Sequence, residues 1–166
     1  MTRLIRVAGT GRRFLNSDLS MPIVRRSRAS DCGEVRQLLS SAELPIEDLQ
    51  PGMLEHFLIA ESAGAIVGLI GLQINETIGL LRSLVVTVSA RRSGLGGKLV
   101  GELEFAARAA GITELWLLTI DAEKFFEMQG FEIVSRDEAP DSIRRSEEFA
   151  DLCPGSAYLM MKKLNA

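Results

Sequence analysis

The sequence predicts an α/β fold built around one mixed, mostly antiparallel central sheet. Short apolar runs rich in β-branched residues alternate along the chain with segments of helical periodicity. Three of these runs, residues 56–61, 65–74 and 78–88, follow one another with only short turns between them, which predicts an antiparallel meander. A helical segment then separates the third run from the next, and this order favours parallel pairing in the middle of the sheet.

The segment before the meander predicts a strand followed by a helix. Residues 22–28 alternate weakly between apolar and polar side chains, which predicts a first strand. In residues 30–44, Asp31 and Glu34 have the spacing of a capping box at a helix N-terminus. One face of this helix is apolar: Val35, Leu38, Leu39 and Ala42.

The segments after the meander alternate between helix and strand. Residues 94–111 carry leucines at helical spacing and end at Gly111, which is typical of a helix C-terminus. The same reasoning gives a further succession of elements: a strand over 113–120, a short helix over 122–130, a strand over 131–135, a helix over 140–152 and a last strand over 156–164.

Composition narrows the function classes. The chain has 166 residues and a net charge of −3, so no global charge favours nucleic acid or an anionic membrane as a partner. Its apolar runs are too short to span a bilayer. Cys32, Cys153 and the single His56 are too few for a structural zinc site or a disulfide framework, so we expect no bound metal and a cytoplasmic protein.

The domain is expected to cover residues 22–166. Residues 1–21 are basic and have no clear period, which favours a disordered extension or a start that lies at Met21, although a targeting or nucleic-acid-binding arm is an alternative.

One glycine-rich stretch between a strand and a helix is a candidate anion-binding site. Residues 91–96 read R-x-x-G-x-G, whereas a Walker loop would need a glycine at Arg92 and a Ser or Thr at Leu99. A dinucleotide fingerprint would need a glycine at Leu99. Glycines before a helix N-terminus let backbone N–H groups approach an anion, and the arginines can add charged hydrogen bonds. The alternative is a plain turn with solvated arginines.

These residues resemble the GNAT superfamily of N-acetyltransferases. The resemblance covers residues 22–164, with "LVVTVSARRSGLG" similar to the family's fourth strand and pyrophosphate loop and "FFEMQGF" similar to a second family motif. It implies acetyl-CoA as co-substrate, a fourth and fifth strand that splay apart around the pantetheine arm, and helices on both faces of the sheet. The cofactor-binding residues that it implies are Leu84, Val85, Val86, Arg91, Arg92, Ser93, Gly94, Leu95, Gly96, Gly97 and Lys98.

A narrower resemblance is to the GNAT proteins encoded with arsenic-resistance genes. It is carried by "LLRSLVV", "LLT", "FFEMQGF" and the tail over residues 139–162. It implies a role in arsenic resistance or detoxification but does not supply the substrate.

Three polar groups common in the family are replaced in this chain. Phe126 stands where many members have a tyrosine general acid, Thr119 where many have an asparagine, and Leu80 where many have a glutamate general base. The general acid and base are therefore not identified, and Thr119 and Cys153 are the candidates near the acceptor. For Cys153 the alternative is a small buried core residue. Positioning the amine against the thioester can supply much of the rate without them.

Arg82 is a charged residue within the mostly apolar fourth strand. By the period of two, Leu80, Arg82, Leu84 and Val86 would share one face. A buried arginine needs an anion, so Arg82, with Ser83 beside it, is expected either to bind an anionic group of the substrate or to form an internal salt bridge.

The sequence thus predicts an acetyl-CoA-dependent N-acetyltransferase, monomeric or homodimeric, that acts on a small, anionic, amino-acid-like amine. The alternative is a non-catalytic acyl-CoA-binding sensor, because the usual tyrosine and glutamate are missing.

Overall fold

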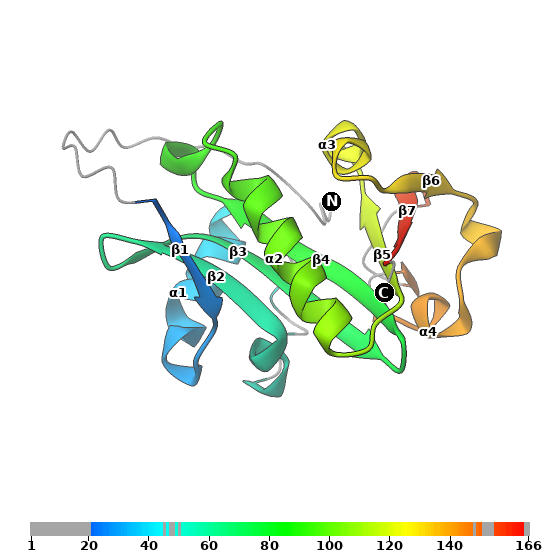
Figure 1. Ribbon diagram of the computed structural model, residues 1–166, viewed down its shortest axis with the longest axis horizontal. Helices are drawn as coiled ribbons and strands as arrows, with labels where there is room; N and C mark the ends of the chain where they lie inside the picture. The colour runs from blue at the N-terminus through cyan, green and yellow to red at the C-terminus, as the bar shows by residue number, and fades with distance from the viewer. Residues whose placement is uncertain are drawn as a thin grey trace.

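The computed structural model describes residues 21–44, 46, 49, 51–147, 149–150 and 155–164. Within these residues one sheet has the strand order β1-β2-β3-β4-β5-β7-β6 (Figure 1). The strands are β1 (Ile23–Arg26), β2 (Phe57–Ser62), β3 (Ala65–Asn75), β4 (Ile78–Val86), β5 (Glu114–Thr119), β6 (Glu132–Val134) and β7 (Tyr158–Lys163). The helices are α1 (Cys32–Ser41), α2 (Leu95–Ala109), α3 (Glu123–Met128) and α4 (Asp141–Arg144), with 3-10 turns η1 (Ala29–Asp31), η2 (Pro51–His56), η3 (Val88–Ala90) and η4 (Arg136–Glu138).

The sheet is mixed, as predicted. Neighbouring strands pair antiparallel except β4 and β5, which are parallel. In the described chain this parallel pairing runs only from Ile78 opposite Glu114 to Leu80 opposite Trp116. Because β4 continues to Val86 and β5 to Thr119, the two strands are not paired over their carboxyl ends. The predicted splay between them is therefore confirmed.

Helices cover both faces of the sheet. On the face that we call the front face, α2 crosses β3 and β4, and its Leu99 and Leu103 pack with Leu81, Leu84 and other core residues (Figure 1). On the opposite or rear face, α1 packs through a second apolar cluster and α4 through a third. Buried aromatic and aliphatic side chains make up these clusters, so apolar burial holds each helix on the sheet.

A β-bulge divides β4 between the two faces. Leu69 pairs with Val85 but Gly71 pairs with Arg82, so the register shifts between them, and Ser83 lies in the left-handed region with φ of 59°. An extra residue in one strand breaks the alternation of side chains. The expectation that Leu80, Arg82, Leu84 and Val86 share one face is therefore wrong.

The two parts of β4 face opposite ways as a result. Leu84 and Val86 lie in the front cluster with α2, whereas Leu80 lies in the rear cluster with α4. Arg82 is opposite Gly71, whose Cβ position is directed at the Phe57 ring of the α1 cluster, so Arg82 belongs to the rear face.

The predicted capping box at α1 is also wrong. The Asp31 carboxylate accepts the backbone N–H of Arg28 at 2.6 Å and the guanidinium of Arg25 at 2.8 Å. Asp31 is the last residue of η1, so its side chain closes that turn instead of capping α1. The Oε2 of Glu34 accepts the backbone N–H of Ile66 at 3.4 Å instead.

Parts of two predicted segments lie outside the described residues. Of the helix predicted over 140–152, the structure bounds Asp141–Arg144 as α4, followed by a turn at Arg145. The predicted extension over 1–21 falls outside the described residues except for Met21. Among the helices that the structure describes, none has the length and apolar content needed to cross a membrane.

Candidate active site

The turn between β4 and α2 presents backbone N–H groups. Gly94, the N-cap of α2, has φ of 82°, a conformation that favours glycine, and no side chain accepts a hydrogen bond at this cap. The Oγ of Ser93 donates to the carbonyl of Ala90 at 2.7 Å and stabilises the turn. The first N–H groups of α2 therefore remain available to an anion, where the helix dipole also favours negative charge.

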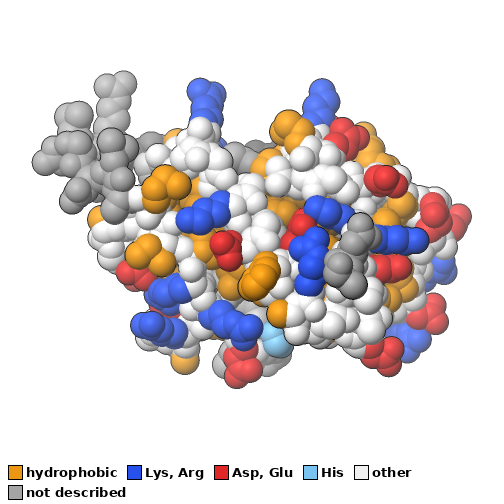
Figure 2. All heavy atoms as spheres, viewed as in Figure 1, with side chains coloured by type: hydrophobic (Ala, Val, Ile, Leu, Met, Phe, Trp, Pro, Cys, Tyr) orange, Lys and Arg blue, Asp and Glu red, His pale blue; other side chains and the backbone are white. Residues whose placement is uncertain are grey.

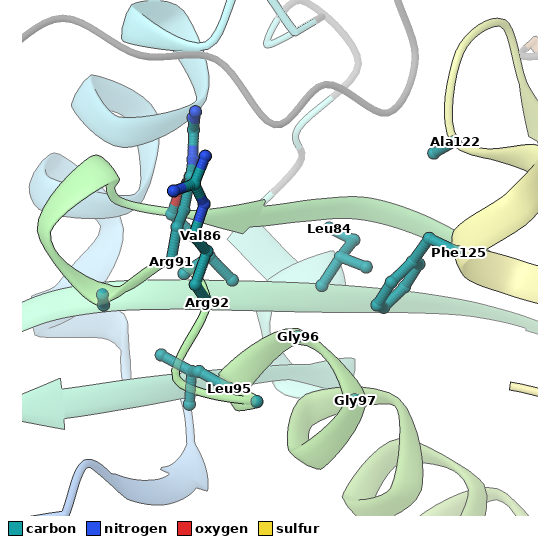
Figure 3. Close-up of a pocket in the computed structure, with 11 residues that line it drawn as sticks. Leu84, Val86, Arg91, Arg92, Leu95, Gly96, Gly97, Ala122 and Phe125 are labelled. Atoms are coloured by element: carbon teal, nitrogen blue, oxygen red, sulfur yellow. Dashed lines mark hydrogen bonds between the residues drawn. The ribbon is translucent and has the colours of Figure 1, made fainter. Parts of the chain in front are cut away.

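A cavity of about 420 Å³ opens beside this turn on the front face (Figure 3). One wall comes from the front-facing residues of β4 and from the turn, and the other from α3, whose Phe125 ring projects towards Leu84 (Figure 3). The lining residues are Leu84, Val86, Ala90, Arg91, Arg92, Gly94, Leu95, Gly96, Gly97, Ala122 and Phe125. The cavity thus lies at the unpaired carboxyl ends of β4 and β5.

Two glycines let the start of α2 approach α3. A Cβ on Gly96 would lie 3.3 Å from the Phe125 ring, and a Cβ on Gly97 would lie 3.3 Å from the side-chain oxygen of Gln129. Both contacts are tighter than most Cβ atoms make, so larger residues would push the helices apart or fill the cavity. The glycines of the motif therefore shape the cavity as well as exposing backbone.

Arg91 brings a partly desolvated charge to the cavity. Its Nε donates to the carbonyl of Val86 at 3.2 Å, while its Nη2 is buried and has no hydrogen-bond partner among the described residues. Burial lowers the pKa of the Arg91 guanidinium from its usual value. A phosphate beside it would supply the missing acceptor and offset the cost of burying the charge.

Most of the predicted cofactor residues meet at this cavity. Leu84, Val86, Arg91, Arg92 and Gly94–Gly97 line it. Three others lie outside the lining, namely Val85, which packs in the rear cluster, Ser93, and Lys98, whose Nζ donates to the carbonyl of Pro22 at 2.9 Å.

The sequence did not single out three of the lining residues, Ala90, Ala122 and Phe125. Ala90 lies inside the quoted motif. Phe125 belongs to the second motif, and its spacing gave no sign that it would face the cavity instead of the core.

Arg82 lies buried behind β4. Its side chain is 2% exposed and its Nε donates to the Oγ of Ser83 at 3.4 Å. The α1 cluster, with Phe57 and Val85, lies on one side along the rear face, and the α4 cluster, with Leu80, lies on the other. A guanidinium in this apolar setting can bind a carboxylate or another oxyacid through two parallel hydrogen bonds.

The catalytic candidates have different surroundings. Thr119 is fully buried at the end of β5, and its Oγ1 accepts the backbone N–H of Ala122 at 3.0 Å, which fixes the turn into α3. Phe126 is also fully buried, in edge-to-face contact with Phe125 and Phe131, and has no proton to donate. Cys153 lies outside the described residues. Within the described residues no group of three or more His, Cys, Asp or Glu side chains is placed to hold a metal ion.

Proteins with similar sequences are named as acetyltransferases. An amino-acid acetyltransferase of Ralstonia nicotianae is 28% identical over 94% of this chain and 35% of its own length. An uncharacterized N-acetyltransferase of Chlorobaculum tepidum is 23% identical over 74% of this chain and 83% of its own length. The chain thus spans about a third of the length of the amino-acid acetyltransferases that it matches.

Solved structures share the fold. N-acetylglutamate synthase of Neisseria gonorrhoeae, complexed with coenzyme A and N-acetyl-glutamate, matches 90% of this chain and 37% of its own with a TM-score of 0.78 at 20% identity. A Mycobacterium tuberculosis protein in complex with CoA and NLQ matches 87% of this chain and 100% of its own with a TM-score of 0.74 at 24% identity.

Residues 54–133 match the acetyltransferase (GNAT) domain. This segment includes the bulged strand β4, the glycine-rich turn, α2 and α3. The family resemblance read from the sequence is confirmed over this segment, which matches the acetyltransferase (GNAT) domain.

Proposed function

We propose that this protein transfers the acetyl group of acetyl-CoA to the amine of a small, anionic, amino-acid-like molecule. The observation that carries the proposal is the arrangement of two arginines around β4. Arg91 lines the front cavity, and its Nη2 is buried without a hydrogen-bond partner among the described residues, whereas Arg82 is buried behind the same strand. The bulge at Ser83 separates them onto opposite faces.

The front cavity suits the cofactor. The N–H groups at the start of α2, with Arg91 and Arg92, provide donors for a pyrophosphate, and Leu84, Val86 and Phe125 provide an apolar path for a pantetheine arm. The solved relatives from Neisseria gonorrhoeae and Mycobacterium tuberculosis were both obtained with coenzyme A, which supports this choice.

The rear face suits an anionic acceptor. Arg82 would bind the carboxylate or oxyacid of the acceptor, with Ser83 holding its Nε. Relatives named amino-acid acetyltransferase and a structural neighbour complexed with N-acetyl-glutamate support an acceptor of this class.

Bound acetyl-CoA supplies an activated acyl group, so the protein has chiefly to orient the amine and exclude water. Because β4 and β5 are not paired beyond Leu80 and Trp116, an amine approaching from the rear would meet the acyl group between the two strands. With Phe126 in the core, no tyrosine donates a proton at that position. The amine proton would therefore pass to solvent, and the thiolate, with a reference pKa of about 8.5, is a tolerable leaving group.

The primary test is a thiol-release assay with acetyl-CoA and a panel of amines. We expect turnover with acidic amino acids and none with polyamines, because a buried cation repels cationic acceptors. Phosphinic and arsenical amino acids belong in the panel, since the narrower resemblance suggests a role in arsenic resistance. Binding of CoA without turnover on any amine would favour the non-catalytic sensor.

Substituting Arg82 with lysine tests the acceptor site. An ammonium cannot make the planar two-point contact, so the acceptor KM should rise by about 10-fold to 100-fold, as for loss of one charged hydrogen bond. The Kd for CoA should stay unchanged. The control is Arg145→Lys, whose side chain is 80% exposed on the turn after α4. A lower Tm with weaker binding of every ligand would instead show that Arg82 holds the fold together.

A cytoplasmic location and a monomeric or homodimeric state remain predictions. Sedimentation of the purified protein with and without CoA would decide the second.

A further inference from the structure

Lys162 joins three elements on the front face. It lies on β7, two residues after the fully buried Met160, and its Nζ donates to the Oε1 of Glu104 at 2.6 Å and to the carbonyl of Gln129 at 2.7 Å. The same Nζ is 5.7 Å from the centre of the Phe131 ring. One ammonium group therefore connects β7 with α2 and with the end of α3.

The partners of Lys162 are themselves well fixed. The side chain of Glu104 is 10% exposed on α2 and also accepts a hydrogen bond from Arg108 at 3.4 Å. Gln129 is the C-cap residue of α3, so its carbonyl is one of the groups that the helix itself leaves without a partner. Lys162 supplies that partner and a favourable charge at this helix end.

These two helices supply opposite walls of the cavity. Gly96 and Gly97 of α2 lie against Phe125 and Gln129 of α3, at the distances given above. The sheet does not fix this spacing, because β4 and β5 are unpaired beyond Leu80 and Trp116. The separation of α2 and α3 therefore sets the width of the cavity.

We propose that Lys162 is a positioning residue for the cofactor. It holds the end of α3 against α2, so that Phe125 and Ala122 stand at the right distance from the glycine-rich turn. The inference rests on the proposed function, since it takes the cavity to be the acetyl-CoA site.

The test separates positioning from stability. Lys162→Met alone leaves Glu104 buried without its lysine and should lower Tm. Glu104→Met combined with Lys162→Met replaces the ion pair with apolar groups and should recover most of that Tm, because buried ion pairs are often replaceable in this way. Neither variant restores a donor to the Gln129 carbonyl. Lys163→Met, at the exposed neighbouring position of β7, is the control.

We expect the double variant to bind CoA about fivefold or more weakly than the wild type, with its kcat at saturating acetyl-CoA little changed. Calorimetry with CoA and steady-state kinetics give both quantities. A double variant with wild-type Tm and wild-type CoA affinity would show that Lys162 only stabilises the fold. If the double variant does not fold, Lys162→Met measured well below its Tm answers the same question. A wild-type protein that does not bind CoA would overturn the proposed function and this inference with it.

Discussion

The two faces of β4 are built from different kinds of sequence. The front cavity comes largely from one contiguous stretch, Leu84–Gly97, completed by Ala122, the N-cap of α3, and by Phe125 of α3. Arg82, where we propose that the acceptor binds, lies between clusters contributed by α1 and α4, more than forty residues away along the chain in each direction. A contiguous loop suits a ligand that stays the same from one enzyme to another, such as the phosphate of a cofactor. A surface built from distant segments can vary with the acceptor.

The chemistry of the two faces differs as well. The proposed cofactor site in front consists of backbone N–H groups and glycines with the charge of Arg91, whereas the proposed acceptor contact behind the strand is the buried guanidinium of Arg82. Elsewhere on the front of the molecule, charged side chains of both signs are interspersed (Figure 2).

Filling the front cavity should have the largest effect. Gly96→Leu would place a side chain between Phe125 and Val86, where an added Cβ already lies 3.3 and 4.0 Å from their atoms. We expect CoA affinity to fall about 100-fold or more, as for loss of about 3 kcal/mol, with little change in Tm because leucine favours a helix. Gly101→Leu, on the same helix with nothing within 4 Å, is the control. Unchanged CoA binding in Gly96→Leu, measured by calorimetry, would contradict the cofactor assignment.

Disturbing the bulge at Ser83 should weaken ligand binding on both faces of β4. Ser83 has φ of 59°, which a β-branched residue adopts with difficulty. We expect Ser83→Val to lower the free energy of unfolding by about 2 kcal/mol and to weaken both CoA and acceptor binding.

Ser83→Gly is the matched control, since glycine accepts this conformation and should keep the stability and the CoA affinity. Chemical denaturation gives the stability. If Ser83→Val weakened the binding of only one of the two ligands, the bulge would not be the feature that orients both faces of β4.

Arg91 and Arg92 should differ despite being neighbours. Arg91→Met removes the buried guanidinium and should weaken CoA binding about tenfold, as for one charged hydrogen bond. Because that charge is desolvated and its Nη2 is unpaired in the described chain, Tm without CoA should not fall. Arg92→Met should have a smaller effect on affinity, because exposed charges are screened. Titrations of both variants with CoA at low and high salt measure these affinities. An equal loss of CoA affinity in the two variants would argue against a special role for Arg91.

The smallest expected effect is on stability and concerns the edge strand β1, which contributes to neither proposed binding site. Arg25 donates to both oxygens of Asp31, at 2.8 and 3.0 Å, and this hydrogen bonding holds the pKa of Asp31 below its usual value. The stabilisation should be present above the unfolded pKa of about 4 and be lost as pH falls through the lower folded pKa. We expect Asp31→Asn to lose on the order of 1 kcal/mol at neutral pH, and to converge with the wild type in acid.

Denaturation at several pH values measures this difference, and CoA affinity at neutral pH should not change. A difference that persisted at low pH would assign the effect to packing instead of charge.

Local patterns predicted most elements correctly. Gly111 and Gly130 both have positive φ just after α2 and α3, as the C-terminal signals indicated. The order of strands and helices followed from periodicity and turn residues, because each depends on side chains a few positions apart. The capping box at Asp31 failed because a second partner, Arg25 on β1, was available for the same carboxylate.

The sequence by itself determined the glycine-rich turn, the strand and the helix that flank it, and the family resemblance. These depend on short-range geometry: a glycine where φ is positive, a helix N-terminus after it, and apolar spacing behind it. Only the tertiary structure decided which way Arg82 faces, that Phe125 lines the cavity, and that Lys162 connects α2 to α3. The physical reason is that each depends on a partner from a distant segment. Ser83, for example, adopts a left-handed conformation where the register between β3 and β4 shifts.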